Sequence, residues 1–165
     1  MKKIALIGLF LLAGTWSFSQ QYKDYSKIPL KTAADCKNAE PEILEAANLV
    51  LKSPLDDVNG ILSMAFIVVW MENSEHTFQI TEPVTKLYSK KTNNLLLGVY
   101  CAALAKFVLE NPDKEKDSKA VQMYAYNALA NYCEKPDNKV KRTMKVKRFI
   151  KAKRKGKLEK YLGYI

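Results

Sequence analysis

The sequence has little of the chemistry that most catalytic and metal-binding sites need. Its 165 residues include one histidine, His76, and three cysteines that are far apart, Cys36, Cys101 and Cys133. It contains no Walker loop, no GxGxxG, HExxH or GxSxG motif and no calcium-loop spacing. A Cys/His zinc site and a serine triad are therefore unsupported. We expect no cofactor and no metal, and the sequence favours a non-enzymatic protein.

Apolar runs long enough to matter for a membrane are also scarce. Residues 1–19 combine Lys2 and Lys3, an apolar run at 4–13, and the small residues Ser17 and Ser19. This order is typical of a secretory signal peptide cleaved after Ser19. The alternative is a membrane anchor, but a spanning helix needs about 20 apolar residues. We therefore predict an exported protein, periplasmic or secreted, whose mature chain begins at Gln20 and has no transmembrane span.

Turn-forming Pro, Asn, Asp and Ser residues separate a series of segments with helical periodicity. The predicted fold class is all-α, a small bundle or irregular array of about five to seven helices after the cleaved signal peptide. We expect an extended or poorly ordered N-terminal segment at 20–37, a helical domain at 38–135 and a basic C-terminal helical segment at 136–165. Within the helical domain the predicted helices cover 38–52, 56–71, 81–91, 94–110 and 118–133.

Two parts of the helical domain carry more specific expectations. The connector between 94–110 and 118–133 is short, which predicts an antiparallel helical hairpin. The segment from Ile61 to Met71 is apolar on every face. This predicts a helix that is buried all round, or else a strand within the segment.

The cysteines of an exported protein can form disulfides, because the periplasm and the extracellular space are oxidising. If a disulfide forms, Cys36 with Cys133 is the favoured pairing, and three free thiols are the alternative. Cys101 lies in an apolar arc and is expected to be a small core residue. In the predicted hairpin Cys133 lies roughly 9 Å beyond the level of Cys101, which disfavours that pairing.

Charge is distributed unevenly along the chain. Residues 139–160 hold 12 basic residues and one acid, Glu159, whereas residues 20–138 hold 13 basic and 16 acidic residues. A body of charge −3 thus carries a segment of charge +11, which would attract polyanions in a salt-dependent way. The predicted anionic-partner residues are Lys139, Lys141, Arg142, Lys145, Lys147, Arg148, Lys151, Lys153, Arg154, Lys155 and Lys157.

The amphipathic character of this segment is predicted to be poor. Val140, Met144, Val146, Phe149 and Ile150 spread over more than half of a helical wheel, with lysines between them. The short apolar finish that follows, residues 158–165, is expected to dock back on the body. A solvated helix that only keeps the protein soluble remains an alternative to a binding segment.

Export determines which anions such a segment meets. These are anionic lipid, acidic polysaccharide or acidic protein, and each Lys or Arg near such a surface contributes about 1 kcal/mol. The leading hypothesis is an exported interaction module of this kind. A second is a small-ligand binder or enzyme with a pocket near Trp70, Glu72, Glu75 and His76, although Met71–Thr77 is expected to be a polar helix exit in solvent. A third, less favoured, is an exported nucleic-acid binder.

Overall fold

The computed structural model describes residues 22–88 and 92–164, so the predicted signal peptide lies outside the described residues. The described part contains eight α-helices, three short 3-10 turns and no strand. The all-α fold class is therefore confirmed, with one helix more than the predicted upper bound. The five long helices are α2 (Glu40–Lys52), α3 (Val58–Asn73), α5 (Leu96–Glu110), α6 (Ser118–Glu134) and α7 (Met144–Arg154). The short ones are α1 (Ala33–Asn38), α4 (Glu82–Thr85) and α8 (Leu158–Leu162).

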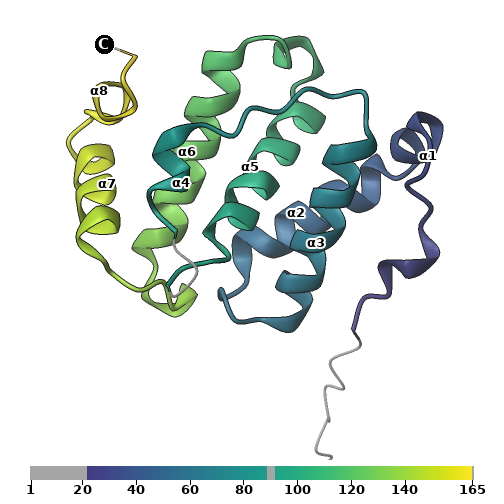
Figure 1. The fold of residues 1–165 in the computed structure, drawn as a ribbon, viewed down its shortest axis with the longest axis horizontal. Helices are drawn as coiled ribbons and strands as arrows, with labels where there is room; N and C mark the ends of the chain where they lie inside the picture. The colour runs from purple at the N-terminus through teal and green to yellow at the C-terminus, as the bar shows by residue number, and fades with distance from the viewer. Residues whose placement is uncertain (1–21, 89–91, 165) are drawn as a thin grey trace, which may run out of the picture.

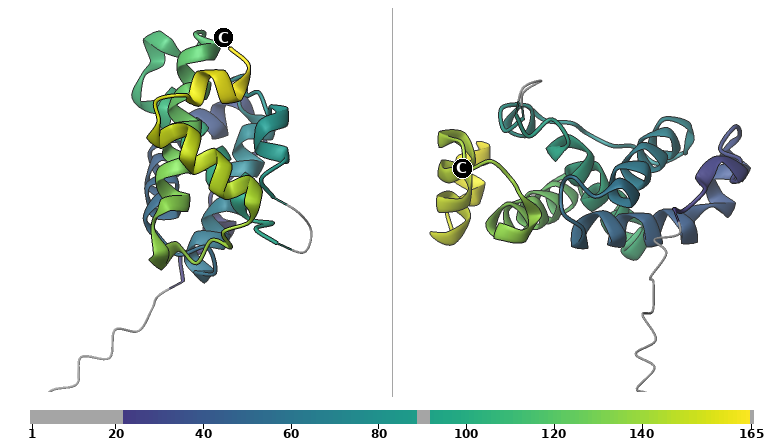
Figure 2. Two further views of the ribbon diagram at one scale, coloured as in Figure 1. Left: turned by 90° about the vertical axis from the view of Figure 1, so that its left-hand side faces the viewer. Right: turned by 90° about the horizontal axis from the view of Figure 1, so that it is seen from below.

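The central element of the array is α5, which has α2 and α3 on one side and α6 on the other (Figure 1). Ten of its fifteen residues are buried, as expected for a helix with neighbours on several faces. The far side of α6 carries α7, which is followed by α8. The molecule is thus an irregular array in which α7 and α8 lie at one end and α1 at the other (Figures 1 and 2).

The predicted pair of helices at 94–110 and 118–133 corresponds to α5 and α6, which pack against each other. The connector contains the 3-10 turn Pro112–Lys114. Asp117 then begins α6, since its side chain accepts a hydrogen bond from the Ala120 N–H at 2.9 Å. On another face of α5, a Cβ on Gly98 would lie only 3.0 Å from the Cβ of Met64 in α3. Glycine at this position therefore allows α3 and α5 to approach closely.

The prediction that the apolar segment at 61–71 is buried all round is wrong. Its helix, α3, packs Met64, Ile67 and Trp70 inward, towards α2 and α5. None of the other long helices covers the opposite face in the described part of the chain, and the apolar side chains there remain 36–50% exposed: Val58, Ile61, Leu62, Val68 and Val69. No helix in the described ranges is long and apolar enough to cross a membrane.

Two short elements fall within or overlap the segment predicted to be extended or poorly ordered, residues 20–37: the 3-10 turn Tyr25–Lys27 and α1. Thr32 and Asp35 form a reciprocal capping box that starts α1. Upstream of α1, the ring of Tyr25 stacks on Phe66 of α3 with 4.2 Å between the ring centroids, and its hydroxyl lies 2.7 Å from Ser63 Oγ. The N-terminal segment, residues 22–31, is thereby held along α3.

The helix predicted at 81–91 is shorter than expected, because α4 ends at Thr85. Residues 89–91 lie outside the described residues.

The three cysteines are free and buried in the structure, which agrees with the alternative of three free thiols rather than with a Cys36–Cys133 disulfide. The two residues are separated along the array: Cys36 lies in α1 at one end, and Cys133 lies in the last turn of α6, the helix against which α7 packs (Figure 1). Burial raises the pKa of Cys101 to about 11 and that of Cys133 to about 12. Both thiols are therefore protonated at neutral pH and behave as small core residues.

Candidate anionic-partner interface

Two buried asparagines fix the chain where it enters the basic segment. Asn138 donates from its side chain to the Tyr132 carbonyl at 2.9 Å, and its own carbonyl accepts from the Leu55 N–H at 3.1 Å. Asn93 forms a reciprocal pair with the backbone of Lys141, with both hydrogen bonds at 2.9 Å. The basic segment is therefore attached to the helical body before α7 begins.

The two faces of α7 are sharply different. Thr143 caps the helix, because its hydroxyl accepts from the Val146 N–H at 3.3 Å. With this start, Val146, Phe149 and Ile150 fall within one arc of about 100°, and all three are buried. The prediction of poor amphipathicity is wrong, since Val140 precedes the helix and Met144 points to solvent with 65% of its surface exposed.

The outward face of α7 is cationic. We call the six exposed cations of α7 and of its C-cap residue the basic face: Lys145, Lys147, Arg148, Lys151, Arg154 and Lys155. Arg148, Lys151 and Lys155 follow one another at helical spacing along its centre. No acidic residue occurs between Asn138 and Leu158, so like charges repel along this face and nothing on α7 neutralises them.

Part of the predicted set contacts the body instead. Lys139 pairs with Asp56 at 2.8 Å, whereas Lys153 and Arg154 share Glu134 at 3.3 and 2.6 Å. Arg142 donates to the Glu134 carbonyl at 2.6 Å. The remaining seven predicted cations form no ion pair with any described residue: Lys141, Lys145, Lys147, Arg148, Lys151, Lys155 and Lys157.

Glu134 therefore joins α6 to the inner edge of the basic segment. Hydrogen bonds from Arg154 and Lys153, together with their positive charge, lower the pKa of this carboxyl group. One carboxylate pairs with two cations here, so the net charge of this cluster is still positive. The sequence did not single out Glu134, because its partners are 19 and 20 residues away.

A hollow lies on one flank of the basic face. Arg142, Lys147, Ile150, Lys151 and Arg154 line it, and its volume is about 300 Å³. Two guanidinium groups and two ammonium groups thus border one small concavity. Both guanidinium groups are bonded to Glu134, whereas Lys147 and Lys151 form no ion pair with any described residue, so the hollow offers positive charge to one anionic group.

The C-terminal residues hold α7 in place rather than extending the interface. Leu158 is buried, the Tyr161 ring lies 5.7 Å from the Phe149 ring, and the Tyr164 hydroxyl donates to Gln122 of α6 at 2.8 Å. The expectation that the apolar finish docks on the body is confirmed for the described residues. Phe149 and Ile150 are consequently packed and cannot insert into a membrane interface.

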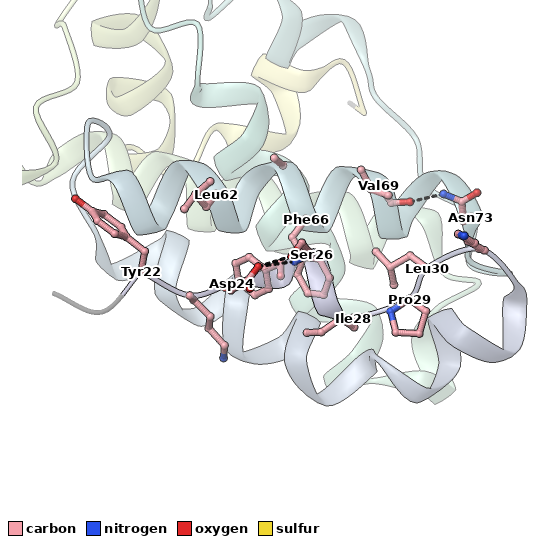
Figure 3. A pocket seen from close by; sticks show the side chains of 14 residues that line it. Tyr22, Asp24, Ser26, Ile28, Pro29, Leu30, Leu62, Phe66, Val69 and Asn73 are labelled. Carbon is pink, nitrogen blue, oxygen red and sulfur yellow. Dashed lines mark hydrogen bonds between the residues drawn. The ribbon is translucent and has the colours of Figure 1, made fainter.

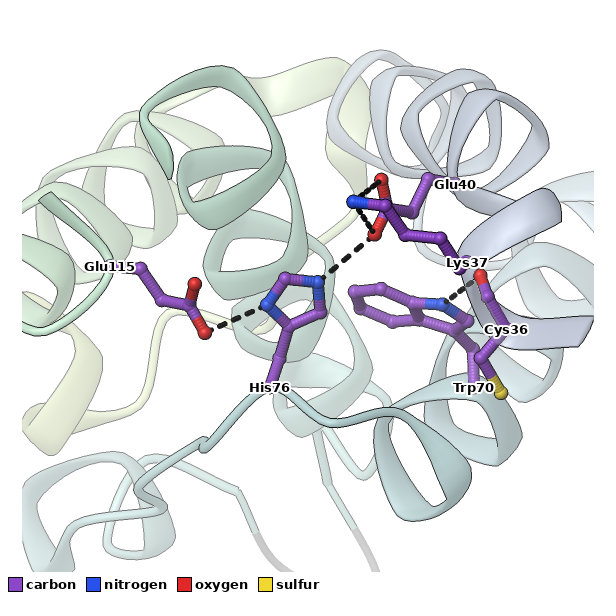
Figure 4. A network of polar contacts seen from close by, with 6 residues as sticks. All are labelled: Cys36, Lys37, Glu40, Trp70, His76 and Glu115. Atoms are coloured by element: carbon purple, nitrogen blue, oxygen red, sulfur yellow. Dashed lines mark hydrogen bonds and ion pairs between the residues drawn. The ribbon is translucent and has the colours of Figure 1, made fainter. Parts of the chain in front are cut away.

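The segment that follows α3 differs from the expected polar exit. His76 lies between Glu115 and Glu40, with 2.8 Å from Nδ1 to Glu115 Oε1 and 3.2 Å from Nε2 to Glu40 Oε1 (Figure 4). Only 17% of its side chain is exposed. Next to it, the buried Trp70 indole donates to the Cys36 carbonyl at 3.0 Å. The prediction that Met71–Thr77 is a polar exit in solvent is therefore wrong at His76.

This histidine ties distant parts of the chain together. Glu40 is 36 residues before it and Glu115 is 39 residues after it, which is why sequence reasoning missed both partners. A cleft of about 330 Å³ lies beside the ring, bordered by Glu75 among others, while Glu72 is exposed. Both ring nitrogens already contact carboxylates on opposite sides, so the arrangement resembles a structural cross-link more than a free acid or base.

Metal binding has no support in the described ranges, where no group of three or more His, Cys, Asp and Glu side chains is placed to hold an ion. The basic face and its hollow are therefore the candidate site with the clearest chemistry, electrostatic attraction of anions. Comparison with protein families, with curated proteins and with solved structures finds no match for this chain.

Proposed function

We propose that this protein is an exported, non-enzymatic interaction module that binds an anionic surface of the cell envelope through α7. The observation that carries the proposal is the division of that helix. Its apolar residues Val146, Phe149 and Ile150 are buried, while the basic face is exposed and five of its six cations, all except Arg154, form no ion pair with any described residue. Export itself rests on the pattern of residues 1–19.

The shape of the basic face favours an extended anionic surface over a single small anion. From Lys145 to Lys155 the helix rises about 15 Å, and cations are present along its whole length. At about 1 kcal/mol per cation near an anionic surface, the basic face supplies on the order of 6 kcal/mol. Such binding is reversible, with a dissociation constant of roughly 10⁻⁴ to 10⁻⁵ M, and is screened by salt.

Co-sedimentation of the mature protein with anionic and neutral vesicles across a salt series tests the proposal. The informative variant replaces three cations at the centre of the basic face, Arg148→Gln, Lys151→Gln and Lys155→Gln. We expect it to bind anionic vesicles about 100-fold more weakly, since each lost cation removes about 1 kcal/mol. Its matched control makes the same charge change at exposed lysines elsewhere, Lys52→Gln, Lys114→Gln and Lys116→Gln, and should bind within a few-fold of wild type.

The outcomes separate the proposal from its rivals. Equal binding by the two triple variants, or binding that salt does not weaken, would count against the basic face. Short duplex DNA that competes with vesicles at near-physiological salt would favour the nucleic-acid hypothesis instead. The pocket hypothesis near His76 predicts no effect of either triple variant on ligand binding.

A further inference from the structure

A second concave surface lies away from α7, at the end of the array that contains α1. The N-terminal segment runs beside the outer face of α3, and together they border a groove of about 980 Å³ (Figure 3). Leu62, Ala65 and Val69 of α3 line it, as does Phe66. The segment contributes an apolar wall of its own, formed by Ile28, Pro29 and Leu30.

The groove is apolar and incompletely covered. Leu62 is 40% exposed and Val69 is 45% exposed, and α3 has no charged residue between Asp57 and Glu72. Apolar surface of this extent on a folded protein commonly marks a binding site. The volume is at the upper end of the range for small-molecule sites, about 300–1,000 Å³.

The length of the groove constrains its occupant. Leu62 lies at one end and Asn73 at the other (Figure 3), which is eleven residues of helix, or about 16 Å. A straight hydrocarbon chain of roughly a dozen methylenes in extended form matches that span. A rigid helix on one side and a held segment on the other favour a narrow, unbranched ligand.

Cations at the rim indicate the charge of the ligand. Three lysines of the N-terminal segment lie near the groove, and two of them are paired: Lys23 with Glu45 and Lys27 with Asp24. Lys31, which lines the groove together with Asn73, has no ion pair with any described residue. The nearby Asp35 carboxylate is engaged by the N–H groups of Lys31 and Thr32. The Lys31 ammonium group thus borders the groove without a direct ion pair, although its charge acts on Asp35, and the one acidic residue among the described residues that line the groove, Asp24, is paired with Lys27.

A second copy of the chain is a poorer fit to this surface. The exposed apolar side chains of α3 are already about half buried, so that face offers only on the order of 400 Å², against about 800 Å² per partner in a stable dimer. This comparison of areas favours a small ligand.

We infer that this groove binds one long-chain fatty acid, with its hydrocarbon chain along α3 and its carboxylate beside Lys31. The ligand has a single negative charge, which the Lys31 ammonium group complements, and an unbranched apolar chain that covers Leu62, Ala65 and Val69. This inference does not depend on the proposed function of α7, since the two sites share no residue.

Calorimetric titration of the mature protein with octanoate, decanoate and dodecanoate, below their micellar concentrations, tests the inference. Each added methylene should strengthen binding about two- to four-fold, as expected when it is buried from water. Ala65→Trp fills the groove and should weaken dodecanoate binding at least 10-fold. Val68→Trp is the matched control, because Val68 is exposed on the same helix but does not line the groove, and it should bind like wild type.

The role of Lys31 has its own readout. Lys31→Gln should weaken dodecanoate binding several-fold and leave the binding of neutral dodecanol unchanged, whereas Lys52→Gln should change neither. The triple variant of the basic face should bind dodecanoate like wild type, which keeps this test separate from that of α7. No saturable binding of dodecanoate, or equal binding by the Ala65→Trp and Val68→Trp variants with both folded by circular dichroism, overturns the inference.

Discussion

The helices α3 and α7 lie in different parts of the array, and different interactions determine which face of each helix is buried. α7 has few apolar residues, and all of its buried ones lie on one face, so only one orientation keeps its cations in water. α3 is apolar on both faces, so hydrophobicity alone does not determine which face is buried. Close contacts decide it, among them that of Met64 with Gly98 and that of Trp70 with the Cys36 carbonyl.

The comparison teaches that strong segregation of charge is a better guide to orientation than a high content of apolar residues. An orientation of α7 with its lysines facing the helical body is excluded, because burying an unpaired ammonium group costs a large free energy. No free-energy cost of that size opposes a rotation of α3 about its axis. The apolar face that stays in solvent is then available to bind a ligand. Four predictions test this difference.

The largest effect should be on the rate at which the cysteine thiols react. This rate shows whether a disulfide joins the part of the array around α3 to the part around α7. Cys36 lies beside α3 and Cys133 is in the helix that carries α7, and both are buried and free. We expect a thiol reagent to modify the native protein at least about 100-fold more slowly than the unfolded protein. Three thiols should react in denaturant without reductant. A count of one would show that a disulfide joins two of the cysteines.

Removing the apolar anchor of α7 should have the largest effect on stability. Phe149 is fully buried, so Phe149→Ala should lower the free energy of unfolding by about 3–5 kcal/mol. Urea denaturation followed by circular dichroism measures the change. Met144→Ala, on the exposed side of the same helix, should change stability by less than about 0.5 kcal/mol. A small effect of Phe149→Ala would mean that α7 is not packed on the body in solution.

The two faces of α3 should respond differently to the same kind of truncation. Ile67 is fully buried, and Ile67→Ala should cost about 2–4 kcal/mol, measured in the same urea experiment. Val69→Ala on the outer face should cost less than about 1 kcal/mol. Equal costs would show that something covers the outer face in solution, and the comparison with α7 would fail.

The smallest effect should come from the ionic contact between α6 and α7. Arg154 and Lys153 lower the pKa of Glu134 below its ordinary value of 4.5. The ionised carboxylate therefore stabilises the fold above about pH 5, and this contribution is lost as pH falls through the lowered pKa. At pH 7, Glu134→Gln should cost about 1 kcal/mol or less. The difference from wild type should shrink in acid, and a difference independent of pH would contradict the ionic origin.

Local patterns predicted most of the helices and failed where a partner was remote. Cap residues and helical periodicity predicted α2, α3, α5 and α6 within a few residues, because those signals lie within one turn of each other. Poor amphipathicity was wrongly predicted for the basic segment because Val140 was counted as part of its helix, although this residue lies before the Thr143 cap. His76 was misjudged because its partners, Glu40 and Glu115, come from separate elements far away in the sequence.

For the candidate site too, the sequence predicted local properties and missed those that depend on remote residues. The predicted set contains every cation of the basic face, since charge is a property of each residue. It did not distinguish those that the body neutralises, such as Lys139 and Arg154, from those that face solvent, such as Arg148 and Lys151. That division depends on the positions of Asp56 and Glu134.

By itself, the sequence determined the helical class, the uneven charge and the scarcity of catalytic side chains, because each of these follows from composition or from neighbours within a few residues. Only the tertiary structure decided which side of α3 is left in solvent, which lysines are free and whether the cysteines meet. These outcomes depend on contacts between elements that are tens of residues apart, and close packing permits few arrangements of such elements.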